Sequence, residues 1–209
     1  MIDETTPTTT LIRFATAQDM GEIARIYAPY TSTPITFDEC PLTTQEFLER
    51  YEQTCRFFPW LVLEHQDHAS SRLLGYAYAH PQHERKAYQW NAETSIYLDQ
   101  DTQGHGYGGV LYDTLLELLQ MLGFKMAYAL VTLPNPASEN LHHSRGFSTM
   151  GIQQHAGYTC GSWRDVAWLV KQLSAFDSHP APPIALETFM ANNPETIRQL
   201  LKKSAARIS

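Results

Sequence analysis

Basic residues, cysteines and histidine clusters are scarce in this chain of 209 residues. Lys and Arg number 15 against 22 Asp and Glu, and the formal net charge of −7 argues against a nucleic-acid partner. Cys40, Cys55 and Cys160 form an odd, widely spaced set that fits neither a disulfide framework nor a zinc site. Such a set is typical of a reducing compartment, so we expect a cytoplasmic protein.

Signals for membranes, secretion and metals are missing as well. No apolar run approaches the roughly 20 residues that a bilayer-spanning helix needs, so we expect no membrane partner. The first residues, "MIDETTPTTT", are polar and acidic, unlike a signal or transit peptide. The nine histidines are scattered, with no H-E-x-x-H motif and no His/Cys pairing. We therefore expect no metal site.

What the chain does have is the composition of an ordinary globular domain, with 43% hydrophobic and 18% charged residues. We expect a flexible leader at residues 1–10, one domain at 11–175 and a tail at 176–209. The tail opens with the proline-rich "DSHPAPPIA", which is typical of a linker. Residues 193–203 then predict a short exposed helix, because a proline near its start and lysines at its end suit helix termini.

Apolar periodicity predicts alternating strands and helices within the domain. Leu111, Leu115, Leu118 and Leu122 recur at helical spacing, so we expect a helix over residues 107–122. Two apolar runs joined by the polar "HQDHASSR" predict a hairpin, because polar turns between such runs are typical of paired strands. The strands expected are 11–15, 60–64, 73–80, 88–99 and 125–132, followed by closing strands within 146–173.

The glycine-rich stretch "QGHGYGG", residues 103–109, precedes the predicted helix and can be interpreted in several ways. It contains G-x-G-x-x-G, but a dinucleotide fold places that turn after its first strand and an acidic residue about 20 positions later. Several strands precede this loop, and no Asp or Glu lies between Glu117 and Glu139. A Walker loop is excluded because no Lys-Ser or Lys-Thr follows the glycines. A turn that only begins a helix remains the structural alternative.

The same stretch also contains Q-x-x-G-x-G, formed by Gln103, Gly106 and Gly108. This pattern suits the pyrophosphate of coenzyme A, since glycines let the backbone approach and the N–H groups at a helix start attract anions. Such a loop explains how an acidic protein could hold a polyanion without a cluster of lysines.

The order of these elements and the motifs around them resemble the GCN5-related N-acetyltransferases (GNAT), and more narrowly their phosphinothricin acetyltransferase branch. The matching motifs lie within residues 11–173 and are "IYAPY", "TFDECP", "PWLV", "GYAYA", "RKAYQWNAETSIYL", "GHGYGGVLY", "LPNPASENLHHSRGF" and "GYTCGSWRDVAW". The resemblance implies a GNAT fold of the α/β (α+β) class, in which a mixed, mostly antiparallel twisted sheet is flanked by helices.

The resemblance further implies acetyl-CoA as the acyl donor, a small-molecule amine as the acceptor and a homodimer. The acceptor amine would attack the thioester directly, without a covalent acetyl-enzyme. Trp163 and Trp168 fall at strand positions near the end of the domain. Aromatic residues there are more typical of a core and a dimer interface than of cofactor contacts.

Acetyl transfer to an amine needs a base, because the nucleophile is the neutral amine and not the ammonium ion. Glu93 is our candidate: it lies on the strand before the glycine loop, and aromatic surroundings should raise its pKa. The resemblance gives this glutamate the same role, while a strand-face Glu satisfied by a salt bridge is the structural alternative. His142 is the second catalytic candidate, at a position where the superfamily often has a tyrosine that protonates the leaving thiolate. A histidine that only bonds carbonyls at a helix end is its alternative.

The resemblance also implies contacts to the donor. Backbone groups of the strand after Glu93 would pair with the pantetheine amides, and two residues of "PNPAS" would bond the pantetheine arm, although capping explains one of them alone. Gln103 stands where the family commonly has arginine, so it can donate a hydrogen bond but no charge. The predicted cofactor-binding residues are Ser95, Ile96, Tyr97, Leu98, Gln103, Gly104, His105, Gly106, Tyr107, Gly108, Gly109, Asn135 and Ser138.

For the acceptor, we predict contacts from Phe37, Tyr78, Arg85 and Tyr88. Arginine suits a carboxylate or phosphinate head group by bidentate hydrogen bonding, while a solvated loop charge is its alternative. The family often has two arginines ahead of "AY", two residues apart, but this chain has His83 in the first position. That departure points away from phosphinothricin itself and toward an acceptor such as methionine sulfone or sulfoximine.

Two other functions remain open at this stage. One is a GNAT-fold protein that binds acyl-CoA without turnover, against which the glycine loop and Glu93 argue. The other is an acetyltransferase that acts on polyamines or protein amines, which the acidic net charge makes conceivable.

Overall fold

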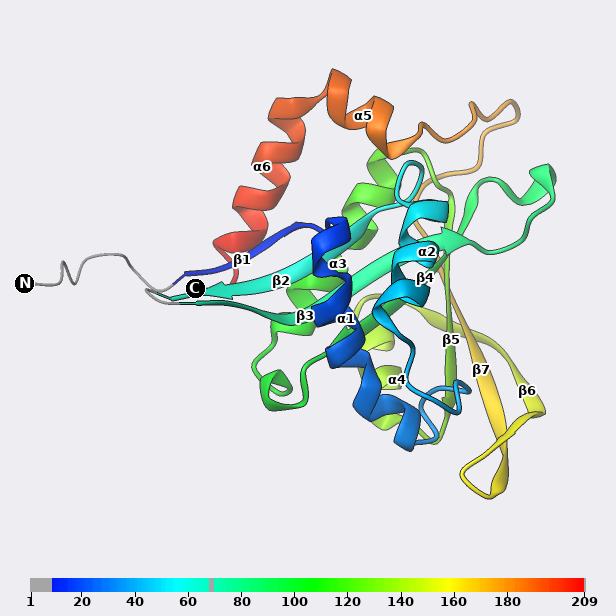
Figure 1. Cartoon of the computed structure of the whole chain (residues 1–209). Coiled ribbons are helices and arrows are strands. Elements are labelled where there is room, and N and C mark those ends of the chain that lie inside the picture. The colour runs from blue at the N-terminus through cyan, green and yellow to red at the C-terminus, as the bar shows by residue number, and fades with distance from the viewer. Residues whose placement is uncertain (1–8, 68–69, 209) are drawn as a thin grey trace, which may run out of the picture.

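The computed structural model describes residues 9–67 and 70–208, and Figure 1 shows their arrangement around one twisted sheet. The described strands follow the order β1-β2-β3-β4-β5-β7-β6. All neighbouring pairs are antiparallel except β4 and β5, which are parallel. The expected mixed, mostly antiparallel sheet is confirmed.

The elements have the following bounds. The strands are β1 (Thr9–Phe14), β2 (Trp60–Gln66), β3 (Ser71–Pro81), β4 (Asn91–Leu98), β5 (Met126–Leu133), β6 (Ser148–Thr159) and β7 (Ser162–Gln172). The α-helices are α1 (Met20–Tyr27), α2 (Thr44–Thr54), α3 (Tyr107–Met121), α4 (Pro136–Ser144), α5 (Leu186–Asn192) and α6 (Pro194–Ala205). Short 3-10 helices are η1 (Ala17–Asp19), η2 (Ala28–Ser32), η3 (Lys86–Tyr88) and η4 (Gln100–Thr102).

Helices α1 and α2 cover one face of the sheet, while α3 and α4 lie behind the other (Figure 1). Each face has its own hydrophobic core. Met20, Ile23 and Phe47 pack with aromatic residues of β3 on the first face. On the second face the four leucines predicted from helical spacing are all fully buried. Helix α3 is therefore held by its leucine stripe, as the sequence predicts.

Most strand boundaries lie one to three residues from the predicted ones, and two of these differences move residues into another element. Residue 88 belongs to η3, because the backbone N–H groups of Tyr88 and Gln89 bond the carbonyls of Arg85 and Lys86 and close turns instead of joining a strand. The strand expected from residue 88 therefore begins at Asn91. At the other end, residues 9 and 10 of the predicted leader belong to β1, where they pair with β2. Residues 1–8 of that leader lie outside the described residues.

The expectation of an exposed C-terminal helix is wrong. Two helices form in the tail, and Ile197 and Leu200 of α6 are buried in the core beside α3. The Oγ of Ser204 lies 2.7 Å from Oγ1 of Thr114, and both residues are buried. An amphipathic helix buries its apolar face when a complementary surface is available, and α3 supplies that surface here.

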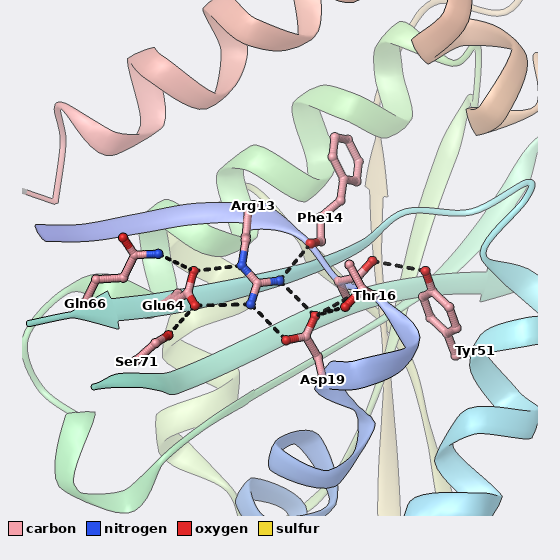
Figure 2. Close-up of polar contacts among 9 residues, drawn as sticks. Arg13, Phe14, Thr16, Asp19, Tyr51, Glu64, Gln66 and Ser71 are labelled. Atoms are coloured by element: carbon pink, nitrogen blue, oxygen red, sulfur yellow. Dashed lines mark hydrogen bonds and ion pairs between the residues drawn. The ribbon is translucent and has the colours of Figure 1, made fainter. Parts of the chain in front are cut away.

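A polar cluster fastens the edge of the sheet to the start of α1 (Figure 2). The guanidinium of Arg13 donates to both carboxylate oxygens of Asp19 at 2.8 Å, and its Nε donates to Glu64 at 2.7 Å. Glu64 also accepts hydrogen bonds from Gln66 and Ser71. The hydrogen bond from Arg13 lowers the pKa of Glu64 despite partial burial. This cluster is structural, because its charges are used in holding β1, β2 and η1 together.

Within the described ranges, no helix is long and apolar enough to cross a membrane. The same part of the chain holds no group of three or more His, Cys, Asp and Glu side chains that could bind a metal ion.

Candidate active site

Strands β4 and β5 separate part-way along their length, and the candidate site lies where they part. Their parallel pairing covers only Asn91–Glu93 against Met126–Tyr128. Among the described residues, no strand pairs with this side of β4 beyond Glu93, so apart from the Leu98 carbonyl, which accepts from Tyr30, its backbone groups there can pair with a bound ligand. A groove of about 290 Å³ opens there, lined by Tyr30, Ile35, Ile96, Tyr97, Leu98, Gln103, Gly104, Gly106, Gly108, Gly109, Asn135, Ala137, Ser138 and Leu141.

The glycine loop closes one end of this groove. Gly104 and Gly106 have φ angles of 84° and 80°, in the left-handed region that favours glycine. Among the described residues, no acceptor takes the backbone N–H groups of Gly104, His105 or Gly106. These donors lie directly before the N-terminus of α3, whose dipole favours an anion. The loop therefore has the geometry of an anion cradle made from backbone.

Gly109 leaves room for a neighbouring side chain. A Cβ atom on Gly109 would lie 1.9 Å from Nη2 of Arg145. Arg145 follows α4, and its Nε lies 3.0 Å from the Asp113 carboxylate on α3. The missing side chain thus lets the end of α4 pack against the start of α3, and these two helices border the groove.

Side chains of the loop fasten it to the protein. Nε2 of Gln103 donates to the hydroxyl of Tyr30 at 3.0 Å, and that hydroxyl donates to the Leu98 carbonyl at 2.6 Å. Nδ1 of His105 lies 3.1 Å from the Gln103 carbonyl oxygen. His105 and Tyr107, both predicted cofactor contacts, are absent from the groove lining. Backbone groups of the loop are thus left as its contacts to an anion.

Three side-chain pairs between β3 and β4 form one face beside the groove. The strand register sets Tyr76 opposite Tyr97, Tyr78 opposite Ser95 and His80 opposite Glu93. The rings of Tyr76 and Tyr97 stack with centroids 5.4 Å apart. The prediction that Glu93, Ser95 and Tyr97 share a face is confirmed, because directly opposed residues of paired strands lie on the same side.

Glu93 lies at the point where β4 and β5 part. Its side chain is 22% exposed, and burial raises the pKa of its carboxyl above the usual 4.5, although the positive charges that His80 and His83 can carry partly oppose this. Its ion pair within the described residues is with His80, at 3.7 Å. A carboxylate with a raised pKa is suited to take up a proton near neutral pH.

His142 lies on α4 and is 3% exposed. Nδ1 lies 2.7 Å from the Ser138 carbonyl oxygen, so it is the protonated nitrogen that donates there. Burial lowers the pKa of His142, which keeps the ring neutral. Nε2 is buried without a partner among the described residues. His142 lines a second hollow of about 60 Å³, which adjoins the groove and includes Ser95 and Thr132.

Asn135 and Ser138 line both hollows. The Asn135 side chain accepts a hydrogen bond from the Ser138 backbone N–H at 3.2 Å, so it caps α4. The side-chain nitrogen of Asn135 and the hydroxyl of Ser138 remain able to contact a ligand.

The residues predicted to bind the acceptor substrate do not gather at one place in the structure. Tyr78 stacks on Trp60 with centroids 4.1 Å apart and lies beside Ser95. Phe37 packs against Gly157 of β6, where a Cβ would lie 2.8 Å from its ring. Arg85 and Tyr88 are exposed and line a separate hollow of about 430 Å³, together with His83 and Glu84. The structure does not bring Arg85 into the groove.

A model of the family described as "Acetyltransferase (GNAT) domain" matches residues 12–168. The chain belongs to this family. Phosphinothricin N-acetyltransferase of Streptomyces viridochromogenes is 36% identical over 173 residues, which are 82% of this chain and 90% of that protein. The L-methionine sulfoximine/L-methionine sulfone acetyltransferase of Salmonella typhimurium is 29% identical, over 82% of this chain and 97% of that protein.

A solved structure also supports membership of this family. The phosphinothricin acetyltransferase of Sinorhizobium meliloti, in complex with AcCoA, is similar with a TM-score of 0.78 and 29% identity, covering 86% of this chain and 97% of that one. The predictions of a GNAT fold and of an N-acetyltransferase are confirmed. The roles of individual residues stay predictions.

This GNAT chain also has groove residues that sequence reasoning missed. Tyr30 lies in the motif "IYAPY", but nothing in the motif indicates that its hydroxyl holds the glycine loop. Ile35 lies in an irregular loop without periodicity. Ala137 and Leu141 share a face of α4 with Ser138, so helical spacing from Ser138 could have found them.

Proposed function

We propose that this GNAT enzyme moves the acetyl group of acetyl-CoA to the amine of a small amino-acid analogue of the phosphinothricin or methionine sulfoximine type. The observation that carries the proposal is the meeting of two features at one point. The groove adjoins a second hollow that Thr94 and Ser95 line, and the half-buried carboxyl of Glu93, the next residue on β4, lies where β4 and β5 part. The relatives named above support the acceptor class.

The groove fits a pantetheine chain and its pyrophosphate. Unpaired backbone of β4 suits the amides, and the N–H groups of Gly104, His105 and Gly106 suit the phosphates. Acetyl-CoA supplies a thioester carbonyl carbon, which the acceptor amine attacks directly.

Glu93 acts as the base in this mechanism. It takes the proton of the acceptor's ammonium group, directly or through water, and frees the nitrogen lone pair for attack. His142 acts as an uncharged hydrogen-bond acceptor. Because its Nδ1–H is used on Ser138, its Nε2 can accept a hydrogen bond from the amine but cannot donate a proton to the departing thiolate in this tautomer. This argues for an orienting role over the acid role.

The acceptor's anionic head group would bind near Arg85 and Tyr88. The Arg85 guanidinium makes no ion pair with the described residues, so it is available for a carboxylate or phosphinate. With His83 in place of a second arginine, one bidentate cation is present, which favours an acceptor with a neutral sulfone or sulfoximine over one that carries a phosphinate charge in addition to its carboxylate.

A homodimer and a cytoplasmic location belong to the proposal too. Strand β6 is an edge strand on which large apolar residues are exposed: Met150 at 58%, Ile152 at 55% and Tyr158 at 58%. Trp163, predicted for the core or an interface, is 60% exposed beside them, so an interface suits it and a core position does not. Contiguous exposed apolar surface of this kind suits a second copy. All three cysteines are free, as a reducing compartment requires.

The test is thiol release from acetyl-CoA with a panel of acceptors: phosphinothricin, methionine sulfone, methionine sulfoximine, spermidine and a peptide amine. We expect release with the amino-acid analogues, and calorimetry should detect acetyl-CoA binding. Binding without release for any acceptor would favour the binding-protein alternative. Release with spermidine or the peptide alone would favour the cationic or protein acceptors.

A further inference from the structure

His80 is placed to exchange a proton with Glu93. The register of β3 and β4 sets the two residues directly opposite each other, and Nε2 of His80 lies 3.7 Å from Oε1 of Glu93. The other ring nitrogen, Nδ1, lies 3.0 Å from the carbonyl oxygen of Pro81, to which it donates its hydrogen. In the neutral ring, Nε2 therefore turns its lone pair toward Glu93.

The pair also connects the less exposed carboxyl group of Glu93 to the more exposed ring of His80. The Glu93 side chain is 22% exposed and that of His80 is 32% exposed. Imidazole gains and loses protons in the neutral range, which suits it to pass a proton between a carboxyl group and water. The separation of 3.7 Å is longer than a hydrogen bond, and a small side-chain rotation closes such a gap.

We propose that His80 relays the acceptor's proton from Glu93 to solvent, a role that rests on the proposed function of Glu93 as the base. An N–H bond of the ammonium group breaks and an O–H bond forms on Glu93. That O–H bond then breaks, and an N–H bond forms at Nε2 of His80. The imidazolium releases a proton to water or buffer, and the Glu93 carboxylate is ready for the next acceptor.

The other titratable groups around the pair do not offer the same route. Tyr78 neighbours His80 on β3 and stacks on Trp60, and Tyr128 of β5 is in register with Glu93. Both are phenols that hold their protons at neutral pH, since burial raises the pKa of each further. His83 acts on Glu93 through its charge, but within the described chain its side chain contacts Gln82 and Tyr88. Arg50 and Asp38 act on Tyr78 and not on Glu93.

The experiment measures kcat of His80→Gln at pH 7 in dilute buffer, with and without added imidazole. We expect kcat to fall about tenfold, a part of the 10²- to 10⁴-fold that general acid–base catalysis contributes. Imidazole should restore most of the loss, because a small base replaces the relay. Affinity for acetyl-CoA and the thermal midpoint should stay at the wild-type values. His80→Asn should behave in the same way, and His179→Gln, exposed in the tail, should match the wild type.

Glu93→Gln is measured beside these variants, so that the two proposals can fail separately. A wild-type kcat in His80→Gln, with Glu93→Gln inactive, overturns the relay and leaves the base in place. A loss in both His80 variants that imidazole does not relieve also overturns the relay, because it indicates a structural role. Full turnover in Glu93→Gln overturns the base and the relay together.

Discussion

The part of the site that binds the acetyl donor and the part that binds the acceptor (the donor side and the acceptor side) use different chemical groups. The donor side consists largely of backbone: the open edge of β4, the N–H groups of Gly104–Gly106 and the start of α3. The acceptor side consists of side chains: Glu93 and His80, which strand register sets opposite each other, and Arg85, which lies in a separate hollow. Backbone groups recognise what all donors share, whereas side chains can differ from one enzyme to the next. We therefore expect changes on one side to leave the other side intact.

The largest expected effect is on the acceptor side. Glu93→Gln keeps the shape of the side chain but removes the base, so kcat should fall by about 10²- to 10⁴-fold. Thiol release at saturating acetyl-CoA and acceptor measures this. Glu52→Gln, an exposed change on α2, is the matched control and should keep the wild-type rate. A Glu93→Gln enzyme with the wild-type kcat would show that another group takes the proton.

The pH dependence should report the same carboxyl. Burial raises the pKa of Glu93 above 4.5, and the base acts only as the carboxylate. Below that raised pKa, kcat/KM for the acceptor should therefore fall about tenfold for each further unit of pH, and recover as the pH rises toward neutrality. The profile is measured from pH 5 to pH 8 for the wild type and Glu93→Gln. An identical acid limb in both enzymes would assign it to another group.

On the donor side, Gly109→Ala should displace Arg145 from its place against α3. Overpacking of this kind typically lowers the free energy of unfolding by about 1–3 kcal/mol, and we expect weaker acetyl-CoA binding to accompany it. Thermal unfolding and calorimetry measure the two effects. Gly21→Ala is the control: its Cβ would meet only ordinary contacts at 3.8 Å, inside helix α1. An unchanged Gly109→Ala enzyme would show that Arg145 moves aside freely.

The smallest expected effect concerns acceptor recognition. Arg85→Ala should raise KM for an anionic acceptor about tenfold, which is roughly 1.4 kcal/mol and close to the lower limit of about 1.5 kcal/mol for a charged hydrogen bond. Affinity for acetyl-CoA should not change. Lys86→Ala, the exposed neighbour, serves as the control for general loss of positive charge. Equal effects of the two variants would indicate a diffuse charge effect instead of a specific contact.

The contrast between the two sides also explains what could be predicted from the sequence. The buried leucines of α3 and the left-handed φ of Gly104 and Gly106 can be predicted from short segments of sequence. Helical periodicity and the conformational freedom of glycine depend only on neighbouring residues. The family motifs then located Glu93 and Asn135. These features account for the sheet, the groove and most of its lining.

Other features depend on partners far away in the chain. Gly109 is small because Arg145 lies against it, 36 residues later, which no local pattern reveals. The contact between His80 and Glu93 depends on the register that the β3–β4 connection sets. One face of helix α6 is buried because α3 and β1 offer it a surface, so the polar appearance of this segment in the sequence was misleading. Tertiary packing decided all three.

The most direct test of the division into two sides is the affinity of Glu93→Gln for acetyl-CoA, measured by calorimetry on the same preparation used for kcat. The account predicts a Kd within about twofold of the wild type, because the donor contacts come from backbone that this change does not touch. A Kd weakened tenfold or more, alongside the loss of turnover, would contradict it by showing that Glu93 helps to build the donor groove.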